Sequence, residues 1–540
     1  MFHQLLTPVA NSLGLSFLVA ALPVLAVLLL LGVLRRPAWE AALAGLLVGV
    51  VIAVGPWQMP FGLALHSILH GATFALWPVM WIVFNALLLY NIAVYSGRFD
   101  AFRVWLLTHL PNDRRIVLVV VGFCFGALLE GIAGFGTPVA ITSSLLILVG
   151  FPPLEALVFV LIFNTAPVAF GALGVPVTVL GAVTHLDAPT LGAMVGRQLP
   201  VLALILPFYV IALYGGWRSV RTLWPVLLVA GGSFAIAQFI ASNYINYTLT
   251  DVLSSLGSLL ATLAFVMIWR PHPEPEFAIK NPVSATEGRA SPVPVWQGWL
   301  PWLIVSATVI LWTSFSVAKK FQQQIAWPTL HKAIAITLYH DKPYDAIWNF
   351  QPLGTGTAIL LACIMTALLF RVSPAGFLGC VAQTARQVWL AVITVMLIIA
   401  LAYLMNYSGL AYTLGEGAAS TGYFFILFSP FLGWLAVLLS GSDTSGNALF
   451  GNLQVVAAKQ LGLNPILFAA TNSSGGVMGK MISPQNIATG VAVTKLKGQE
   501  GRVFARIFIH SVILTLVLVV LVTVQQFLIP GIIPSPPATP

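Results

Sequence analysis

Charged residues are scarce in this sequence: they make up 7% of its 540 residues, whereas 59% are hydrophobic. So few charges exclude an ordinary soluble globular protein, and the many apolar runs are typical of a chain that crosses a membrane several times. In a soluble protein, the net charge of +9 would favour nucleic-acid binding, but here the Lys and Arg residues lie in short segments between apolar runs. They therefore indicate membrane topology, and we expect no nucleic-acid partner.

Cysteine is nearly absent, and its three residues, Cys124, Cys363 and Cys380, all fall within or beside apolar runs. Their spacing matches neither a disulfide framework nor a set of metal ligands, so we interpret them as packing residues. His66 and His70 have the spacing of helical metal ligands, but no third ligand accompanies them. We expect no metal and no cofactor apart from a coupling ion.

Apolar runs long enough to cross a bilayer recur along the chain, and we predict about twelve full spans, ordinary ones at 199–214 and 223–241 among them. Two further apolar blocks have a polar or glycine-rich centre, EGIAGFGTP at 130–138 and LSGSDTSGN at 439–447. The lipid interior has no water to form hydrogen bonds with the free backbone N–H and C=O groups of such segments. We therefore predict that each block is a re-entrant helical hairpin, which enters and leaves the membrane on one side.

Two spans carry a polar interruption, FNTAPVAFGALGVP at 163–176 and TNSSGGVMGKMISPQN at 471–486. Each is predicted to be a broken transmembrane helix whose freed backbone lines a cavity within the protein. The two breaks share landmarks: Asn164, Gly171 and Pro176 match Asn472, Gly479 and Pro484.

The two hairpins and a YSG motif, at 95–97 and 407–409, recur in the same order as the breaks, about 310 residues apart, which indicates an internal duplication. We divide the chain into an N-terminal membrane repeat at 1–269, a cytoplasmic linker at 270–297, and a C-terminal membrane repeat at 298–540. The C-terminal repeat carries an extramembrane loop at 319–351.

The distribution of basic residues predicts that both termini lie outside, because most basic loops then face the cytoplasm. The second repeat is then inverted relative to the first. The prediction is an all-α polytopic membrane protein of two inverted repeats, each with a re-entrant hairpin and a broken transmembrane helix. Secondary transporters have this architecture and bind their substrate near the midplane of the membrane. Whether this protein would then move the substrate by an elevator or by a rocking motion stays open.

Lys480 lies in the middle of the second broken span. A charge at the bilayer centre costs roughly 2.5–3.5 kcal/mol, so Lys480 needs a partner or an anionic ligand. Ser483 and Pro484 fit the N-cap and first residue of a new half-helix, whose positive end would point into the cavity. The segment therefore predicts an anion site.

The first hairpin offers further groups for an anion, because Gly134, Gly136 and Thr137 have free backbone N–H groups if Thr137 caps the second arm. Glu130 in this hairpin and Asp443 in the other are acids at membrane depth, which by default carry protons or ions. The alternative is that either acid pairs with Lys480 or caps its hairpin tip.

Small polar residues accompany these charges in the breaks and the second hairpin. They either bind substrate or satisfy freed backbone groups, and both interpretations remain open. The candidate substrate-binding set is completed by Asn164, Thr165, Ser445, Asn472, Ser473 and Ser483.

Three segments, EGIAGFGTPVAI, SGSDTSGNALFGNLQ and TNSSGGVMGKMISPQNIATG, are long and unusual in composition. They are similar to the signature segments of the bacterial lactate permease family, and the likeness covers nearly the whole chain except the loops at 270–297 and 319–351. The resemblance implies a symporter of L-lactate, D-lactate and glycolate with protons, in the bacterial cytoplasmic (inner) membrane.

Three hypotheses of function follow. The leading one is a proton-coupled importer of small 2-hydroxy monocarboxylates, whose partners are this substrate and membrane lipid. A sodium-coupled dicarboxylate symporter is the alternative, but it requires a second substrate cation beside Lys480. An intramembrane hydrolase with Ser445 or Ser473 as nucleophile is disfavoured because no His lies in either break, so we expect no enzyme. The oligomeric state stays open.

Overall fold

The computed structural model describes residues 1–132, 134, 137–269, 274–279, 294–494, 496 and 498–535. Most of the chain is helical. The helices of the first half are α1 (Leu13–Gly32), α2 (Ala38–Val54), α3 (Phe61–Phe74), α4 (Trp81–Tyr95), α5 (Arg98–His109), α6 (Arg114–Val117), α7 (Gly126–Ile132), α8 (Thr137–Leu148), α9 (Pro153–Phe163), α10 (Gly171–Thr184), α11 (Ala188–Ile240) and α12 (Thr250–Ile268).

The helices of the second half follow a polar segment. They are α13 (Leu300–Ser314), α14 (Val317–Lys320), α15 (Thr355–Leu369), α16 (Pro374–Ser408), α17 (Leu410–Ala419), α18 (Phe425–Ser440), α19 (Asp443–Gln460), α20 (Pro465–Lys480), α21 (Pro484–Thr494) and α22 (Glu500–Phe527). The two YSG motifs each end a helix with a glycine in the left-handed region, Gly97 at φ 73° and Gly409 at φ 99°.

Eight helical segments of the described chain are long and apolar enough to cross a membrane, or nine if the bent pair of α9 and Val168–Thr184 counts as one span. The chain is therefore a multi-pass helical membrane protein. The finer count of about twelve spans stays a prediction. The segments predicted as separate spans at 199–214 and 223–241 fall in the two halves of α11, which folds back on itself at Gly216 (φ 68°). A Cβ added at Gly231 would lie 2.7 Å from the Leu204 carbonyl oxygen, so the two halves pack side by side.

The two segments predicted as hairpins each contain a pair of helices around a tip. In the first, α7 ends at Ile132 and α8 begins at Thr137. In the second, α18 ends at Ser440, Gly441 turns the chain at φ 70°, and the Ser442 hydroxyl accepts the Ser445 N–H as the N-cap of α19. That both tips re-enter one side of a membrane stays a prediction.

The two predicted breaks differ in the structure. The first is a true break, because the chain bends by 63° after α9, and Ala172, Leu173 and Gly174 all have positive φ. The second is much shorter than predicted, since α20 stays helical from Pro465 through Lys480 and only 481–483 separate it from α21.

Close helix packing explains why the glycines of α20 do not break it. A Cβ added at Gly475 would collide with the Pro430 carbonyl of α18, and one at Gly479 with the Trp434 carbonyl. These glycines therefore let α18 and α20 approach closely, as small residues do in membrane helix pairs. For this reason the break predicted at 471–486 is confined to 481–483.

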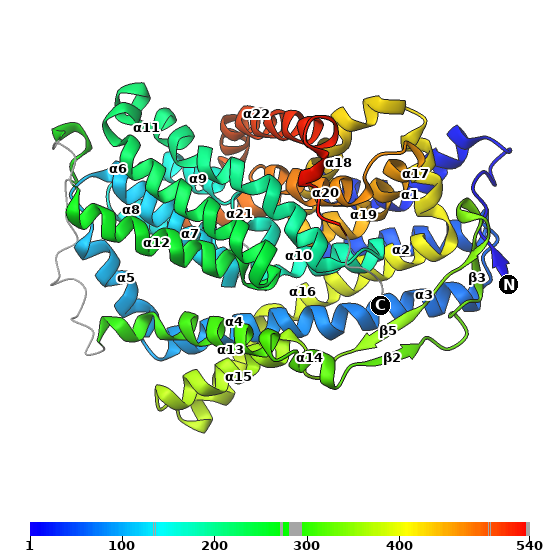
Figure 1. The fold of residues 1–540 in the computed structure, drawn as a ribbon, viewed down its shortest axis with the longest axis horizontal. Helices are drawn as coiled ribbons and strands as arrows, with labels where there is room; N and C mark the ends of the chain where they lie inside the picture. The colour runs from blue at the N-terminus through cyan, green and yellow to red at the C-terminus, as the bar shows by residue number, and fades with distance from the viewer. Residues whose placement is uncertain are drawn as a thin grey trace.

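The second halves of the broken helices cross between the two halves of the chain. Helix α10 packs against α19 of the second hairpin, and α21 packs against α8 of the first. Both lie in the upper part of the molecule in Figure 1, above a layer that contains α3, α4 and α13. Helix α16 connects the two parts, because it packs against α2, α3, α4 and α19. This crossing brings both hairpin tips and both breaks to one place.

Short strands interrupt the all-α prediction. In the segment predicted as an extramembrane loop, β2 (Gln323–Ala326) pairs antiparallel with β5 (Ile347–Phe350), and β3 (Ile334–Ile336) pairs antiparallel with β4 (Lys342–Pro343). Strand β1 (Phe2–His3) adds to β3 in parallel, with Phe2 opposite Ile334. The N-terminus is thereby fastened to this segment (Figure 1).

Candidate functional site

A buried ion pair joins the two halves of the chain. The Lys480 Nζ lies 2.5 Å from the Glu130 Oε1, and the two residues are 7% and 2% exposed. Lys480 is the last residue of α20, where the helix dipole favours a cation. The Asn164 Nδ2 donates to the other Glu130 oxygen at 3.0 Å. The sequence left open whether Glu130 pairs with Lys480 or caps its hairpin tip. The structure shows that Glu130 pairs with Lys480.

Asp443 has a different environment, although it too is buried. Its Oδ2 accepts a hydrogen bond from the Ser473 hydroxyl at 2.5 Å and one from the Asn447 Nδ2 at 3.3 Å. Its Oδ1 has no hydrogen-bond partner within the described residues. Asn447 also donates to the Pro176 carbonyl at 3.2 Å, so the amide links the second hairpin to the first broken helix.

A small pocket of about 60 Å³ lies between these charges. Such a volume holds only a few water molecules, so the pocket suits a ligand of a few heavy atoms. It is lined by Glu130, Gly134, Val168, Gly171, Ala172, Val175, Pro176, Gly441, Ser442, Asp443, Thr444, Lys480, Gln485 and Asn486. Both hairpin tips and both breaks contribute to it, with one cation and two acids.

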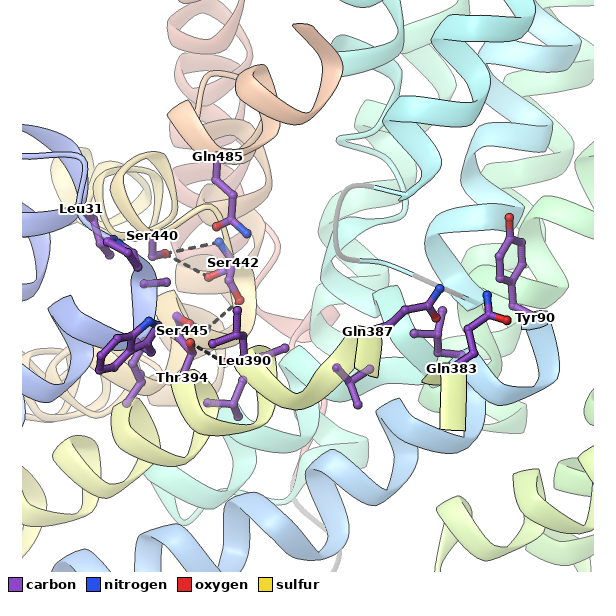
Figure 2. Close-up of a pocket in the computed structure, with 18 of the residues that line it drawn as sticks. Leu31, Tyr90, Gln383, Gln387, Leu390, Thr394, Ser440, Ser442, Ser445 and Gln485 are labelled. Atoms are coloured by element: carbon purple, nitrogen blue, oxygen red, sulfur yellow. Dashed lines mark hydrogen bonds between the residues drawn. The ribbon is translucent and has the colours of Figure 1, made fainter. Parts of the chain in front are cut away.

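A larger cavity of about 670 Å³ adjoins the small pocket, and Ser442 and Gln485 line both. In Figure 2 these two side chains lie together at the hairpin tip, while Gln383 and Gln387 of α16 lie toward the other end. Most of the remaining lining comes from α2, α4 and α16. The larger cavity therefore leads to the small pocket from the side of α2, α4 and α16.

Several residues predicted from the sequence meet at the pocket. Lys480, Glu130, Asp443 and Gly134 line it, and Gly134 has a positive φ of 55°. Gly136 lies outside the described residues, and Thr137 begins α8 without a described side chain. The anion-binding role of the first tip stays a prediction.

Other predicted residues do not line the pocket but form hydrogen bonds around it. Asn164 and Ser473 hold the two acids, and the Thr165 hydroxyl donates to the Ile162 carbonyl at 2.7 Å. The Asn472 Nδ2 donates to the Gly446 carbonyl at 3.2 Å and to Asn447 Oδ1 at 3.0 Å, away from the pocket lining.

The last two predicted positions lie at helix starts. The Ser483 Oγ accepts the Asn486 N–H at 3.3 Å, as predicted for the cap of α21, and Ser445 lines the larger cavity. Among these positions the structure therefore separates residues of the lining from residues that hold the lining in place.

Three residues near the pocket were missed. Gln485 and Asn486 line it, and Asp251 is buried beside the first hairpin. Asp251 is an acid at the start of an apolar run, the signal that identified Glu130, but it follows the polar residues YTLT, and this made it resemble a loop residue. Gln485 and Asn486 have no such signal, because uncharged polar residues are common after a helix start.

The chain resembles known permeases over nearly its whole length. A family model described as L-lactate permease matches residues 16–529. Glycolate permease GlcA of Escherichia coli strain K12 is 40% identical over 97% of this chain and 98% of its own length. L-lactate permease of the same strain has the same identity and coverage. The solved YdaH transporter of Alcanivorax borkumensis is 16% identical over 81% of this chain and 88% of its own, with a TM-score of 0.32.

Proposed function

Because the chain belongs to the L-lactate permease family, we propose that it imports L-lactate, D-lactate and glycolate together with a proton. The chain is a transport protein of the membrane, and its relatives are named for L-lactate and for glycolate. The observation that carries the proton-coupled mechanism is the buried pair of Lys480 and Glu130 at the small pocket.

Competition for Lys480 couples the substrate to a proton. A lactate carboxylate that binds in the pocket takes Lys480, the one cation in the described lining, away from Glu130. A buried Glu130 without its cation is strongly disfavoured as an anion, since breaking a buried pair costs about 3–5 kcal/mol. Glu130 therefore takes up a proton when the substrate binds. One proton then enters with each lactate.

The pocket also offers partners for the rest of a small hydroxy acid. Ser442, Thr444, Gln485 and Asn486 present hydroxyl or amide groups, and Val168, Ala172 and Val175 present apolar surface for a methyl group. Such a lining, mostly apolar with a few polar groups, is typical of small-molecule sites. Asp443, held by Ser473 and Asn447, is the second acid through which we propose that the proton passes.

We propose that transport involves a movement of the hairpins, and the packing of each broken helix against the hairpin of the other half supports this. Each broken helix ends against the hairpin of the other half, so a movement of one hairpin changes the pocket and its access at once. We place both termini outside, the linker at 270–297 in the cytoplasm, and the two repeats in inverted orientation. The larger cavity, which lies near Pro37 after the basic pair Arg35 and Arg36, is then the cytoplasmic vestibule.

Uptake of labelled L-lactate into proteoliposomes tests this function. With the outside more acidic, we expect accumulation of lactate, and we expect none when a protonophore removes the pH gradient. Replacing sodium by choline should change nothing. Accumulation that requires sodium and ignores the pH gradient would instead support the sodium-coupled alternative.

A further inference from the structure

Asp251 is a third buried acid near the pocket. It lies in the first turn of α12 and is 0% exposed. Neither of its carboxylate oxygens has a hydrogen-bond partner within the described chain. Glu130 has a lysine and an amide, and Asp443 has a hydroxyl and an amide. Asp251 is therefore the least supported of the three acids.

Asp251 lies close to the chain segment that carries Glu130. Helix α12 packs against α7, and a Cβ added at Gly131 would lie 2.6 Å from the Asp251 Cβ. Gly131 directly follows Glu130, so the absence of a side chain there lets Asp251 approach the residue that pairs with Lys480.

Few charged groups surround Asp251. The elements that pack against α12 include α7, α10, α11, α13 and the segments Leu118–Phe125, Ala241–Ile245 and Tyr247–Leu249. The charged residues on these elements are Glu130 of α7, which pairs with Lys480, and Arg197, Arg218 and Arg221 of α11. The nearby neutral groups Tyr247 and Cys124 bond Thr178 and Ser258 instead.

The surroundings decide the protonation of Asp251. An ionised carboxylate without hydrogen bonds in a buried site costs several kcal/mol. The N-terminal turn of a helix favours an anion by only about 0.3–1 kcal/mol, up to roughly 2 in buried geometry. The cost outweighs this gain, so Asp251 holds a proton while Glu130 is paired with Lys480.

We propose that Asp251 is a proton site that supplies Glu130 when a substrate carboxylate takes Lys480. Once Glu130 has left Lys480, its freed carboxylate turns to within hydrogen-bond distance of Asp251. The Asp251 O–H bond then breaks, the proton goes to a Glu130 oxygen, and the Asp251 carboxylate takes the next proton from water on the side from which lactate enters. One lactate and one proton are thus bound together. This inference rests on the proposed function and adds the donor of its proton.

Proteoliposomes with the Asp251→Asn variant test the inference. At one proton per lactate, a gradient of about one pH unit drives about tenfold accumulation in the unmodified protein. We expect the variant to lose this accumulation because an amide cannot pass on a proton, and to keep exchange of internal for external lactate, which requires no net proton transfer. Asp187→Asn is the matched control, because Asp187 caps α11 by accepting the Thr190 N–H and Asn caps equally well.

The outcomes separate the two proposals. If the unmodified protein shows no accumulation on a pH gradient, the proposed function fails. If it accumulates lactate and Asp251→Asn does so equally, the proton-donor role is wrong while the function stands. Should Asp251→Asn not insert into the membrane, Asp251→Glu takes its place: a displaced acid should shift the pH of half-maximal uptake, and an unchanged pH profile would overturn the inference.

Discussion

The two broken helices occupy matching places in the two halves, yet they are built differently. The first bends by 63° and holds two non-glycine residues, Ala172 and Leu173, in the left-handed region. Each such residue costs roughly 1–2 kcal/mol. The second remains a helix up to Lys480, because its glycines pack against α18. The strain therefore lies in the first half, whereas the cation is fixed at the end of a rigid helix in the second.

This difference assigns separate roles to the halves. A rigid helix end keeps Lys480 in place, and the acids can exchange with substrate around it. Strained backbone concentrates at sites that change conformation, so the first break is the part that we expect to move. Each of the following experiments alters one side of this comparison.

Loss of the fixed cation should have the largest effect. We predict that Lys480→Ala lowers lactate transport by about 100-fold or more, since a buried pair partner is worth about 3–5 kcal/mol. The variant also leaves Glu130 unpaired. The double variant Lys480→Ala with Glu130→Gln should therefore recover the melting temperature without recovering uptake. Near-normal affinity of Lys480→Ala for lactate would show that the lysine is only a structural partner.

The charge balance of the pocket predicts the driving force. One lactate carried with one proton moves no net charge, so a membrane potential imposed with potassium and valinomycin at equal pH should give no accumulation. With a second proton, each 100 mV would supply about 2.3 kcal/mol, roughly a fiftyfold accumulation. Clear accumulation under this condition would contradict one proton per lactate.

Replacement of Asp443, the second acid of the pocket, should have a smaller effect on transport than replacement of Lys480. This effect can be measured separately from lactate binding. Asp443→Asn should remove the roughly tenfold accumulation that about one pH unit drives. It should leave lactate exchange, because Asn still bonds Ser473 and Asn447. Accumulation that persists in this variant would leave Glu130 and Asp251 as the proton groups.

The rigidity of α20 can be tested through stability. A Cβ in Gly479→Ala would strike the Trp434 carbonyl, and we expect a loss of about 1–3 kcal/mol, seen as a lower melting temperature in detergent. A Cβ added at Gly379 on α16 would have no neighbouring atom within 4 Å, so Gly379→Ala is the matched control and should be neutral or slightly stabilising. Equal melting temperatures for the two variants would argue against tight packing of α18 and α20.

The sequence predicted the charged centre of the site better than its backbone. A lysine at membrane depth needs a partner, and from this rule alone Glu130 and Asp443 were candidates; the structure shows Glu130 as the partner. The polar residues around Asn472 predict a break that the structure does not have there, because sequence does not distinguish glycines that unwind a helix from glycines that let two helices approach. Only the position of α18 makes that distinction.

Other features depend on contacts between distant segments. The parallel pairing of β1 with β3 places Phe2 opposite Ile334. The local sequence around either residue does not predict this pairing. Asp251 becomes notable only when Gly131 brings it beside Glu130. The family resemblance supplied the substrate class, whereas the proton path had to be argued from the contacts of individual carboxylates.

The central claim is that lactate displaces Glu130 from Lys480 and that Glu130 takes a proton as this happens. Proton uptake by the purified protein in weakly buffered detergent solution, followed with a pH indicator as L-lactate is added, tests it directly. We predict one proton taken up per lactate bound. In Glu130→Gln we predict no uptake, together with about tenfold tighter lactate binding, because the competitor for Lys480 is gone. Unchanged proton uptake in Glu130→Gln, with unchanged affinity, would contradict the account.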